Sequence, residues 1–180
     1  KEVTEKAIKY SPDAIIIVVS NPLDVMTYAA YLAANKNPHK VFGMAGILDT
    51  GRYKAFLADA LEVSPNDIHA MLLGGHGDTM VPLPRYTSIS GIPVTELLDQ
   101  TEIDKIVERT RKGGGELVTL MGTSAWYAPG AAVGQMVEAI VDDQNRIFPV
   151  CAYLNGEYGL KEIYLGVPVK LGRHGVEQVI

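Results

Sequence analysis

Residues 14–19, Ala-Ile-Ile-Ile-Val-Val, form the longest strictly apolar run of the chain and constrain its fold more than any other segment. A continuous run rich in β-branched residues is typical of a strand buried on both faces of a parallel sheet. Ser20-Asn21-Pro22 ends the run, and because proline suits the first turn of a helix, a helix is predicted over Leu23–Ala34. Val41–Ala45 is a second short apolar segment. Together these segments predict a strand–helix–strand unit.

The rest of the chain changes character after this unit. Apolar spacing and turn residues predict a helix over Asp49–Glu62, a strand over Ile68–Leu73 and two or three short strands between Met80 and Val94. They also predict a long helix over Ile103–Met121, a helix over Ala125–Val141, and an antiparallel pair formed by Ile147–Leu154 and Ile163–Val169. The long helix is interrupted by Gly113-Gly114-Gly115, which indicates either a helix break or close packing of the helix. The fold class is therefore parallel α/β first and mixed α+β afterwards.

Composition narrows the class of protein. The 180 residues are enough for one domain or for a domain with part of another. With 47% hydrophobic and 21% charged residues, the chain should be packed rather than disordered. Its net charge of -5 argues against binding to nucleic acid or to an anionic membrane. The six-residue apolar run is far short of the roughly 20 residues that span a bilayer. The single cysteine, Cys151, favours a reducing, cytoplasmic compartment.

One histidine stands in a context that favours proton transfer. His76 lies in Gly74-Gly75-His76-Gly77-Asp78, after a predicted strand. The unperturbed pKa of histidine, about 6.5, suits a general acid or base near neutral pH. The flanking glycines allow a sharp turn and the close approach of a ligand. The alternative is an ordinary loop histidine. We predict no metal site, because His69 and His76 are poorly spaced for one.

Two charged residues could complete such a site. A carboxylate that accepts from one ring nitrogen fixes the tautomer of a catalytic imidazole, and Asp49 is the candidate. The alternative for Asp49 is a helix N-cap. Arg52 lies three residues further on the same helix face, and its planar guanidinium binds carboxylates through two hydrogen bonds. The alternative for Arg52 is an exposed pair with Asp49. Asn21 follows a predicted parallel strand, where open α/β sheets bind ligands; it could also be a plain turn residue.

At these spacings the chain resembles the lactate/malate dehydrogenase family, and the malate branch more closely. The resemblance rests on the following segments: Val18-Val19-Ser20-Asn21-Pro22-Leu23-Asp24, Gly43-Met44-Ala45-Gly46, Leu48-Asp49-Thr50-Gly51-Arg52, Gly74-Gly75-His76-Gly77-Asp78, Arg109-Thr110-Arg111-Lys112-Gly113-Gly114, Ala125-Trp126-Tyr127-Ala128-Pro129 and Tyr164-Leu165-Gly166-Val167-Pro168. The resemblance implies that residues 1–45 are a remnant of the NAD-binding Rossmann domain and that residues 46–180 are the catalytic domain.

The resemblance also implies roles and partners. His76 would be the proton donor and acceptor, Asp49 its partner, and Arg52 the anchor of the substrate carboxylate. Asn21 would touch the substrate, and Val19, Ser20 and Asn21 the nicotinamide half of NAD. The expected substrates are malate and oxaloacetate, and the expected assembly is a homodimer or homotetramer. Small residues near Ser124 and Ala125, where lactate enzymes usually carry threonine, favour malate.

Other family features are absent from the sequence. No Gly-x-Gly-x-x-Gly motif opens the chain, and the mobile loop whose arginine recognises a second carboxylate would lie before Lys1. We therefore expect a piece of a longer protein that lacks the N-terminal cofactor-binding half and a final C-terminal helix, and that is inactive with NAD by itself. Two alternatives remain: a lactate or other 2-hydroxy-acid dehydrogenase, and an inactive fragment that retains only a subunit interface.

Overall fold

The computed structural model describes residues 1–77 and 79–180, and it contains the predicted strand–helix–strand unit after a first helix. Helix α1 (Glu2–Tyr10) is followed by β1 (Ile16–Val18), α2 (Leu23–Ala34), the short helix η1 (Pro38–Lys40) and β2 (Val41–Gly43). Strands β1 and β2 are parallel, as expected from an intervening helix. The prediction that β1 is buried on both faces is wrong for this chain. The strand is half-buried, and β2 is the one strand that pairs with it among the described residues.

The main sheet continues from β2 into the C-terminal half of the chain. Its strand order is β1-β2-β8-β9-β4-β5, with β10 paired to β9. The bounds are Leu72–Gly74 for β4, Met80–Pro82 for β5, Arg146–Asn155 for β8, Lys161–Gly172 for β9 and Gly175–Val179 for β10. The predicted antiparallel pair is confirmed as the long β8–β9 ladder. Strand β10 was not predicted.

A second, three-stranded sheet holds β3 (Ile68–His69), β6 (Ser88–Ile89) and β7 (Ile92–Pro93). The single strand predicted over Ile68–Leu73 is therefore wrong. Its two ends have different partners: Ile68 pairs with Ile89 in the small sheet, and Leu72 pairs with Pro82 in the large one. The prediction of two or three short strands between Met80 and Val94 is confirmed by β5, β6 and β7.

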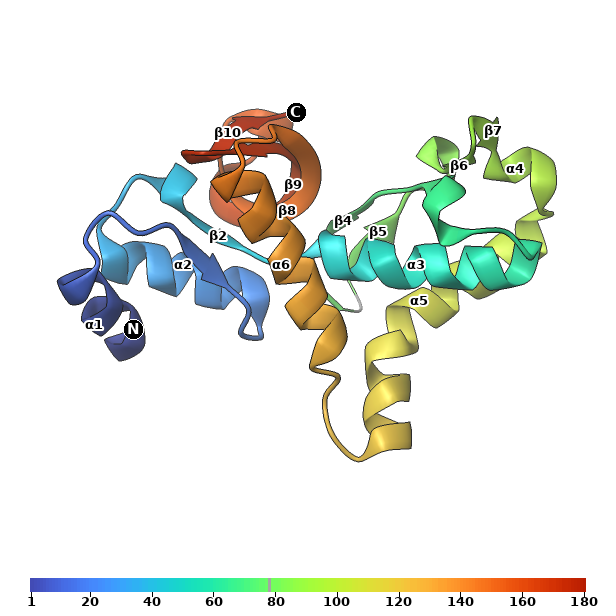
Figure 1. Ribbon diagram of the computed structural model, residues 1–180, viewed down its shortest axis with the longest axis horizontal. Coiled ribbons are helices and arrows are strands. Elements are labelled where there is room, and N and C mark those ends of the chain that lie inside the picture. Colours follow the sequence, from blue (N-terminus) through green and yellow to red (C-terminus); the bar gives the residue numbers. More distant parts are fainter. Residues whose placement is uncertain (78) are drawn as a thin grey trace.

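The remaining helices are α3 (Gly46–Leu61), α4 (Val94–Leu97), α5 (Gln100–Met121) and α6 (Tyr127–Val141), with short helices η2 (Pro65–Asp67), η3 (Pro84–Tyr86) and η4 (Glu157–Gly159). The predicted interruption at Gly113-Gly114-Gly115 is wrong, because α5 runs through the three glycines. It bends in its middle without breaking (Figure 1).

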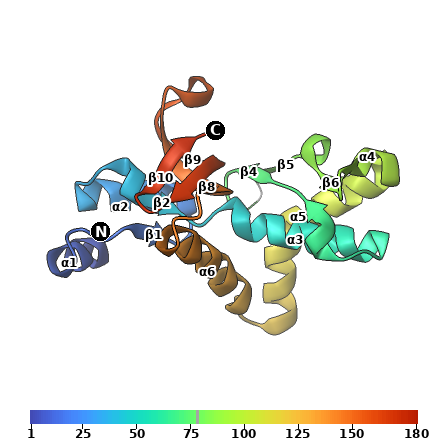
Figure 2. The same ribbon diagram turned by 45° about the horizontal axis from the view of Figure 1, so that its top comes forward.

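Of the four apolar clusters among the described residues, the two largest both include residues of α3. One cluster lies around β8, β9 and α6 and includes Ile47, near the start of α3. The other includes Tyr53 and Leu57 from the same helix, packed with residues of β3, β4 and α5. Figure 2 shows α1 and α2 at one end of the molecule and α3 and α5 toward the other, with β2, β8, β9 and β10 between them. Residues on α3 are thus fixed from both sides.

Gly46, the first residue of α3, allows this helix to approach the sheet closely. A Cβ atom there would lie 2.0 Å from the carbonyl oxygen of Leu72 in β4. Thr50, one turn later, accepts a hydrogen bond at 3.0 Å from the Leu72 backbone N–H. The start of α3 is therefore fastened to β4, the strand that leads to His76. Within the described part of the chain, no helix is both long and apolar enough to cross a membrane.

Candidate active site

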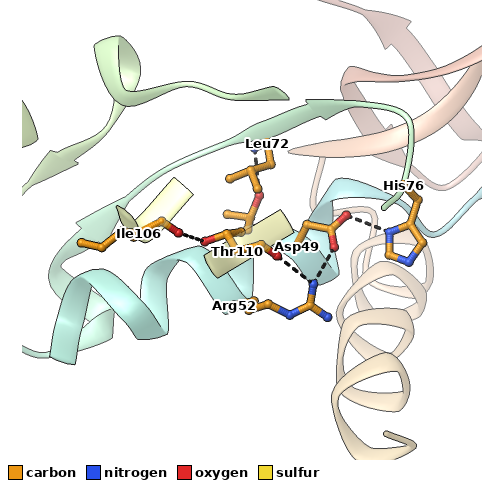
Figure 3. Close-up of polar contacts among 7 residues, drawn as sticks. Asp49, Arg52, Leu72, His76, Ile106 and Thr110 are labelled. Atoms are coloured by element: carbon orange, nitrogen blue, oxygen red, sulfur yellow. Dashed lines mark hydrogen bonds and ion pairs between the residues drawn. The ribbon is translucent and has the colours of Figure 1, made fainter. Parts of the chain in front are cut away.

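Asp49 is the buried centre of a polar chain (Figure 3). Helix α3 begins at Gly46, with Ala45 as its N-cap residue, so the N-cap alternative for Asp49 is wrong. The Asp49 side chain is 1% exposed. One carboxylate oxygen, Oδ2, lies 2.8 Å from Nδ1 of His76, and the other, Oδ1, lies 3.2 Å from Nη1 of Arg52. A buried carboxylate needs such partners, because an unpaired charge is costly to remove from water.

His76 lies in the loop that follows β4, as predicted. Gly74 and Gly77 have φ angles of 79° and 103°, which glycine adopts at little cost. Because a carboxylate only accepts, Nδ1–H of His76 donates to Asp49, and Nε2 is left to exchange a proton with a ligand. The hydrogen bond to Asp49 raises the pKa of His76, while partial burial opposes the shift. Asp78, the last residue of this motif, lies outside the described residues.

Arg52 is held on two sides. Its Nη1 group donates to Asp49 at 3.2 Å and to the backbone carbonyl of Thr110 in α5 at 3.4 Å. Its side chain is 15% exposed, so the alternative of an exposed surface pair is wrong. The guanidinium retains further N–H groups, and the residue lines a cavity. An arginine fixed in this way can bind a carboxylate without first having to be ordered.

The cavity beside Arg52 has a volume of about 580 Å³, which is a size typical of small-ligand sites. Its lining is mainly apolar and comes from α3, α5, α6 and the segment between α5 and α6. Asn21, Arg52, Ser124 and Gln135 supply the polar side chains of the lining. A few polar groups in an apolar wall fix the orientation of a ligand. His76 and Asp49 do not belong to the lining itself; Arg52 links them to it.

Of the three predicted cofactor-binding residues after β1, one lines the cavity. Asn21 lines the cavity, and it is exposed. Val19 is 45% exposed and Ser20 is exposed, but neither belongs to the cavity lining. The structure therefore brings His76, Asp49 and Arg52 into one hydrogen-bonded chain, and Asn21 lines the same cavity as Arg52. The roles of Val19, Ser20 and Asn21 stay predictions.

Two features near the site could not be read from the residues alone. Thr110 acts through its backbone carbonyl, for which no residue type gives a signal. Asp24 accepts a hydrogen bond at 3.1 Å from the buried thiol of Cys151, and its charge adds to the raised pKa of His76. Burial also raises the pKa of the Cys151 thiol, which therefore remains protonated and able to donate.

Known proteins share both the sequence and this architecture. Residues 47–180 match the model of the lactate/malate dehydrogenase alpha/beta C-terminal domain, and residues 1–43 match that of the family's NAD binding domain. The chain belongs to the lactate/malate dehydrogenase family. A malate dehydrogenase of Cytophaga hutchinsonii is 65% identical over 180 residues, which are 100% of this chain and 58% of that protein.

Solved structures of family members agree. The malate dehydrogenase of Salinibacter ruber superposes with a TM-score of 0.98 at 61% identity, over 99% of this chain and 59% of that one. A lactate dehydrogenase from Eimeria maxima, solved with NADH and oxamate, superposes with a TM-score of 0.95 at 45% identity, over 99% of this chain and 58% of that one. The chain thus spans a little under three-fifths of the length of these relatives. The fold predicted from the sequence is confirmed.

Proposed function

We propose that the complete protein containing this chain is an NAD-dependent malate dehydrogenase, which oxidises (S)-malate reversibly to oxaloacetate. One observation carries the proposal: His76, Asp49 and Arg52 form a hydrogen-bonded chain at the edge of a largely apolar cavity. The relatives that are 55–65% identical over nearly the whole chain and are named malate dehydrogenases support the choice of substrate.

In this proposal the three residues divide the chemistry. Arg52 binds the carboxylate next to the reacting carbon and so orients the hydroxyl group toward His76. During oxidation Nε2 of His76 accepts the hydroxyl proton, and during reduction the imidazolium returns a proton to the carbonyl oxygen. Asp49 holds the ring by Nδ1 and stabilises the imidazolium. The nicotinamide of NAD supplies the acceptor for the hydride that leaves the substrate carbon.

The described residues fit the nicotinamide half of the cofactor. Asn21 lines the cavity and carries an amide that can both donate and accept hydrogen bonds. Val19 and Ser20 are exposed beside it at the carboxyl end of β1, which is where parallel sheets bind dinucleotides. The apolar cavity wall suits a flat aromatic ring. We propose Val19, Ser20 and Asn21 as the residues of this chain that would hold it.

Three further properties belong to this proposal. The division into a Rossmann remnant at residues 1–45 and a catalytic domain at 46–180 is supported by family matches that end at residue 43 and resume at 47. We also propose a homodimer or homotetramer and a cytoplasmic location. Exposed apolar side chains on α6, among them Tyr127 and Val141, supply surface that such an assembly could bury.

Replacing Arg52 with lysine should mainly weaken substrate binding. Lysine keeps the positive charge but loses the planar fork that pairs with a carboxylate through two hydrogen bonds. We expect the KM for oxaloacetate to rise about tenfold or more, which corresponds to the loss of one charged hydrogen bond. The KM for NADH should change little. Steady-state kinetics of the complete enzyme would measure both constants, and an unchanged KM for oxaloacetate would remove Arg52 from the carboxylate site.

The substrate is tested by comparing oxaloacetate with pyruvate as oxidants of NADH, using the complete enzyme. The lactate alternative remains because the Eimeria maxima neighbour is a lactate dehydrogenase of the same fold. Small residues such as Ala125 in the cavity wall leave room for a second carboxylate. We expect kcat/KM to be higher for oxaloacetate. A preference for pyruvate would favour the lactate alternative, and turnover of neither would favour the interface alternative.

A further inference from the structure

Three glycines stand in succession in the middle of α5, although glycine is the least favourable helix residue after proline. Gly113 is buried, Gly114 is half-buried and Gly115 is exposed. Helix α5 nevertheless continues through them. Helix α5 packs against α3, and its glycines carry no side chains at this point. The space left there indicates that a side chain of α3 occupies it.

The three positions differ sharply in their relation to Arg52. A Cβ atom at Gly113 would lie 2.4 Å from Cδ and 2.9 Å from Nε of Arg52. At Gly114 the nearest described atom would be Nη2 of Arg52, at 3.7 Å, which is an ordinary contact. At Gly115 no described heavy atom would lie within 4 Å. Only at Gly113 does the space that an alanine would need coincide with the Arg52 side chain.

The same helix also fixes the head of Arg52. The backbone carbonyl of Thr110, one turn before Gly113, accepts a hydrogen bond from Nη1. In Figure 3 the Arg52 side chain leaves α3 and its guanidinium lies below Thr110 and Asp49, while the Asp49 carboxylate lies between that guanidinium and His76. The aliphatic part of the Arg52 side chain packs against the backbone at Gly113. The carbonyl of Thr110 and the carboxylate of Asp49 orient its guanidinium.

We propose that Gly113 is a positioning residue for the substrate carboxylate, because the absence of a side chain there lets Arg52 lie against α5 and present its guanidinium to the cavity. This inference rests on the proposed function, since it takes Arg52 as the anchor of a 2-oxo-acid carboxylate. A side chain at position 113 displaces the stem of Arg52 and moves the guanidinium away from the orientation that binds the substrate.

The test compares Gly113→Ala with Gly115→Ala in the complete enzyme. Both replace a mid-helix glycine with the best helix former, so their effects on α5 itself should match. We expect Gly113→Ala to raise the KM for oxaloacetate about tenfold, as expected for one lost charged hydrogen bond. The KM for NADH should stay unchanged. Gly115→Ala should leave both constants at the wild-type values.

A double-mutant cycle with Arg52→Ala separates positioning from general damage. Shortening residue 52 removes the Cδ and Nε atoms that an alanine at position 113 would meet. Adding Gly113→Ala to Arg52→Ala should therefore change kcat/KM by less than about twofold and should not lower the thermal midpoint. In the wild-type background, Gly113→Ala should lower that midpoint relative to Gly115→Ala.

The outcomes distinguish this inference from the function on which it rests. If the wild-type enzyme reduces oxaloacetate but Gly113→Ala and Gly115→Ala have the same KM, the positioning role is wrong. Equal losses caused by Gly113→Ala in both residue-52 backgrounds would also overturn it. If the wild-type enzyme does not reduce oxaloacetate, the proposed function fails. The coupling of thermal midpoints would then still show whether residues 113 and 52 compete for one space.

Discussion

Replacing His76 with asparagine in the complete enzyme is expected to lower kcat for oxaloacetate reduction by about 10²–10⁴-fold, the usual contribution of a positioned general acid or base. Asparagine is similar in size and polar, but it cannot exchange a proton near neutral pH. His76 lies in a loop and makes its described hydrogen bond through one ring nitrogen, so the fold should survive. Steady-state kinetics with a thermal melt would measure both effects.

His69→Asn is the matched control for this variant. His69 is exposed in β3, on the small sheet, and has no part in the polar chain around Asp49. Its replacement should leave kcat unchanged. A His76→Asn enzyme that retained more than about a tenth of wild-type turnover would contradict proton transfer by His76, since such a loss is smaller than general acid–base catalysis contributes.

Replacing Asp49 with asparagine should reduce turnover and move the pH profile. An amide does not hold the imidazole in one tautomer or stabilise its charged form as a carboxylate does, so we expect kcat to fall on the order of 10²-fold or more. The hydrogen bond to Asp49 is the largest cause of the raised pKa of His76. Without this carboxylate the pKa of His76 should fall.

The direction of the pH shift follows from which form of His76 reacts. Reduction of oxaloacetate needs the imidazolium, so its kcat/KM should decline as pH rises through the pKa of His76. In the Asp49→Asn enzyme this decline should begin at a lower pH. The charges of Asp24 and Arg52 also act on His76, raising and lowering its pKa respectively. Asp24→Asn should therefore give a smaller shift in the same direction. A profile that did not move in Asp49→Asn would exclude Asp49 as the partner of the titrating group.

The sequence was most informative where spacing and chemistry coincide. A buried-strand pattern followed by Asn-Pro predicted the first strand–helix–strand unit, and glycines around His76 predicted a loop that turns sharply. Residues 49 and 52, three apart on a helix, had to share a face, which the structure confirms. Asp49 also contacts His76, 27 positions away, because α3 packs against β4. Such a tertiary contact is not encoded in the periodicity of the sequence.

Two predictions of secondary structure were wrong for the same reason, because tertiary contacts are not visible in local sequence. Gly113-Gly114-Gly115 left a break and close packing as alternatives, and a break was expected because intrinsic propensity disfavours glycine in helices. The structure keeps the helix, and α5 packs against α3 with Arg52 lying against Gly113. The segment from Ile68 to Leu73 looked like one strand, because alternation cannot show that its two ends join different sheets. In both cases contacts between distant segments overrode a local preference.

The most direct test of the whole account is a crystal structure of the complete enzyme with NAD and hydroxymalonate, a 2-hydroxy dicarboxylate. We expect one carboxylate of the analogue to pair with the guanidinium of Arg52, and its hydroxyl oxygen to lie about 3 Å from Nε2 of His76, within reach for proton transfer. The His76–Asp49 hydrogen bond should persist. An analogue bound in the cavity without contact to either Arg52 or His76 would contradict the assignment of this site.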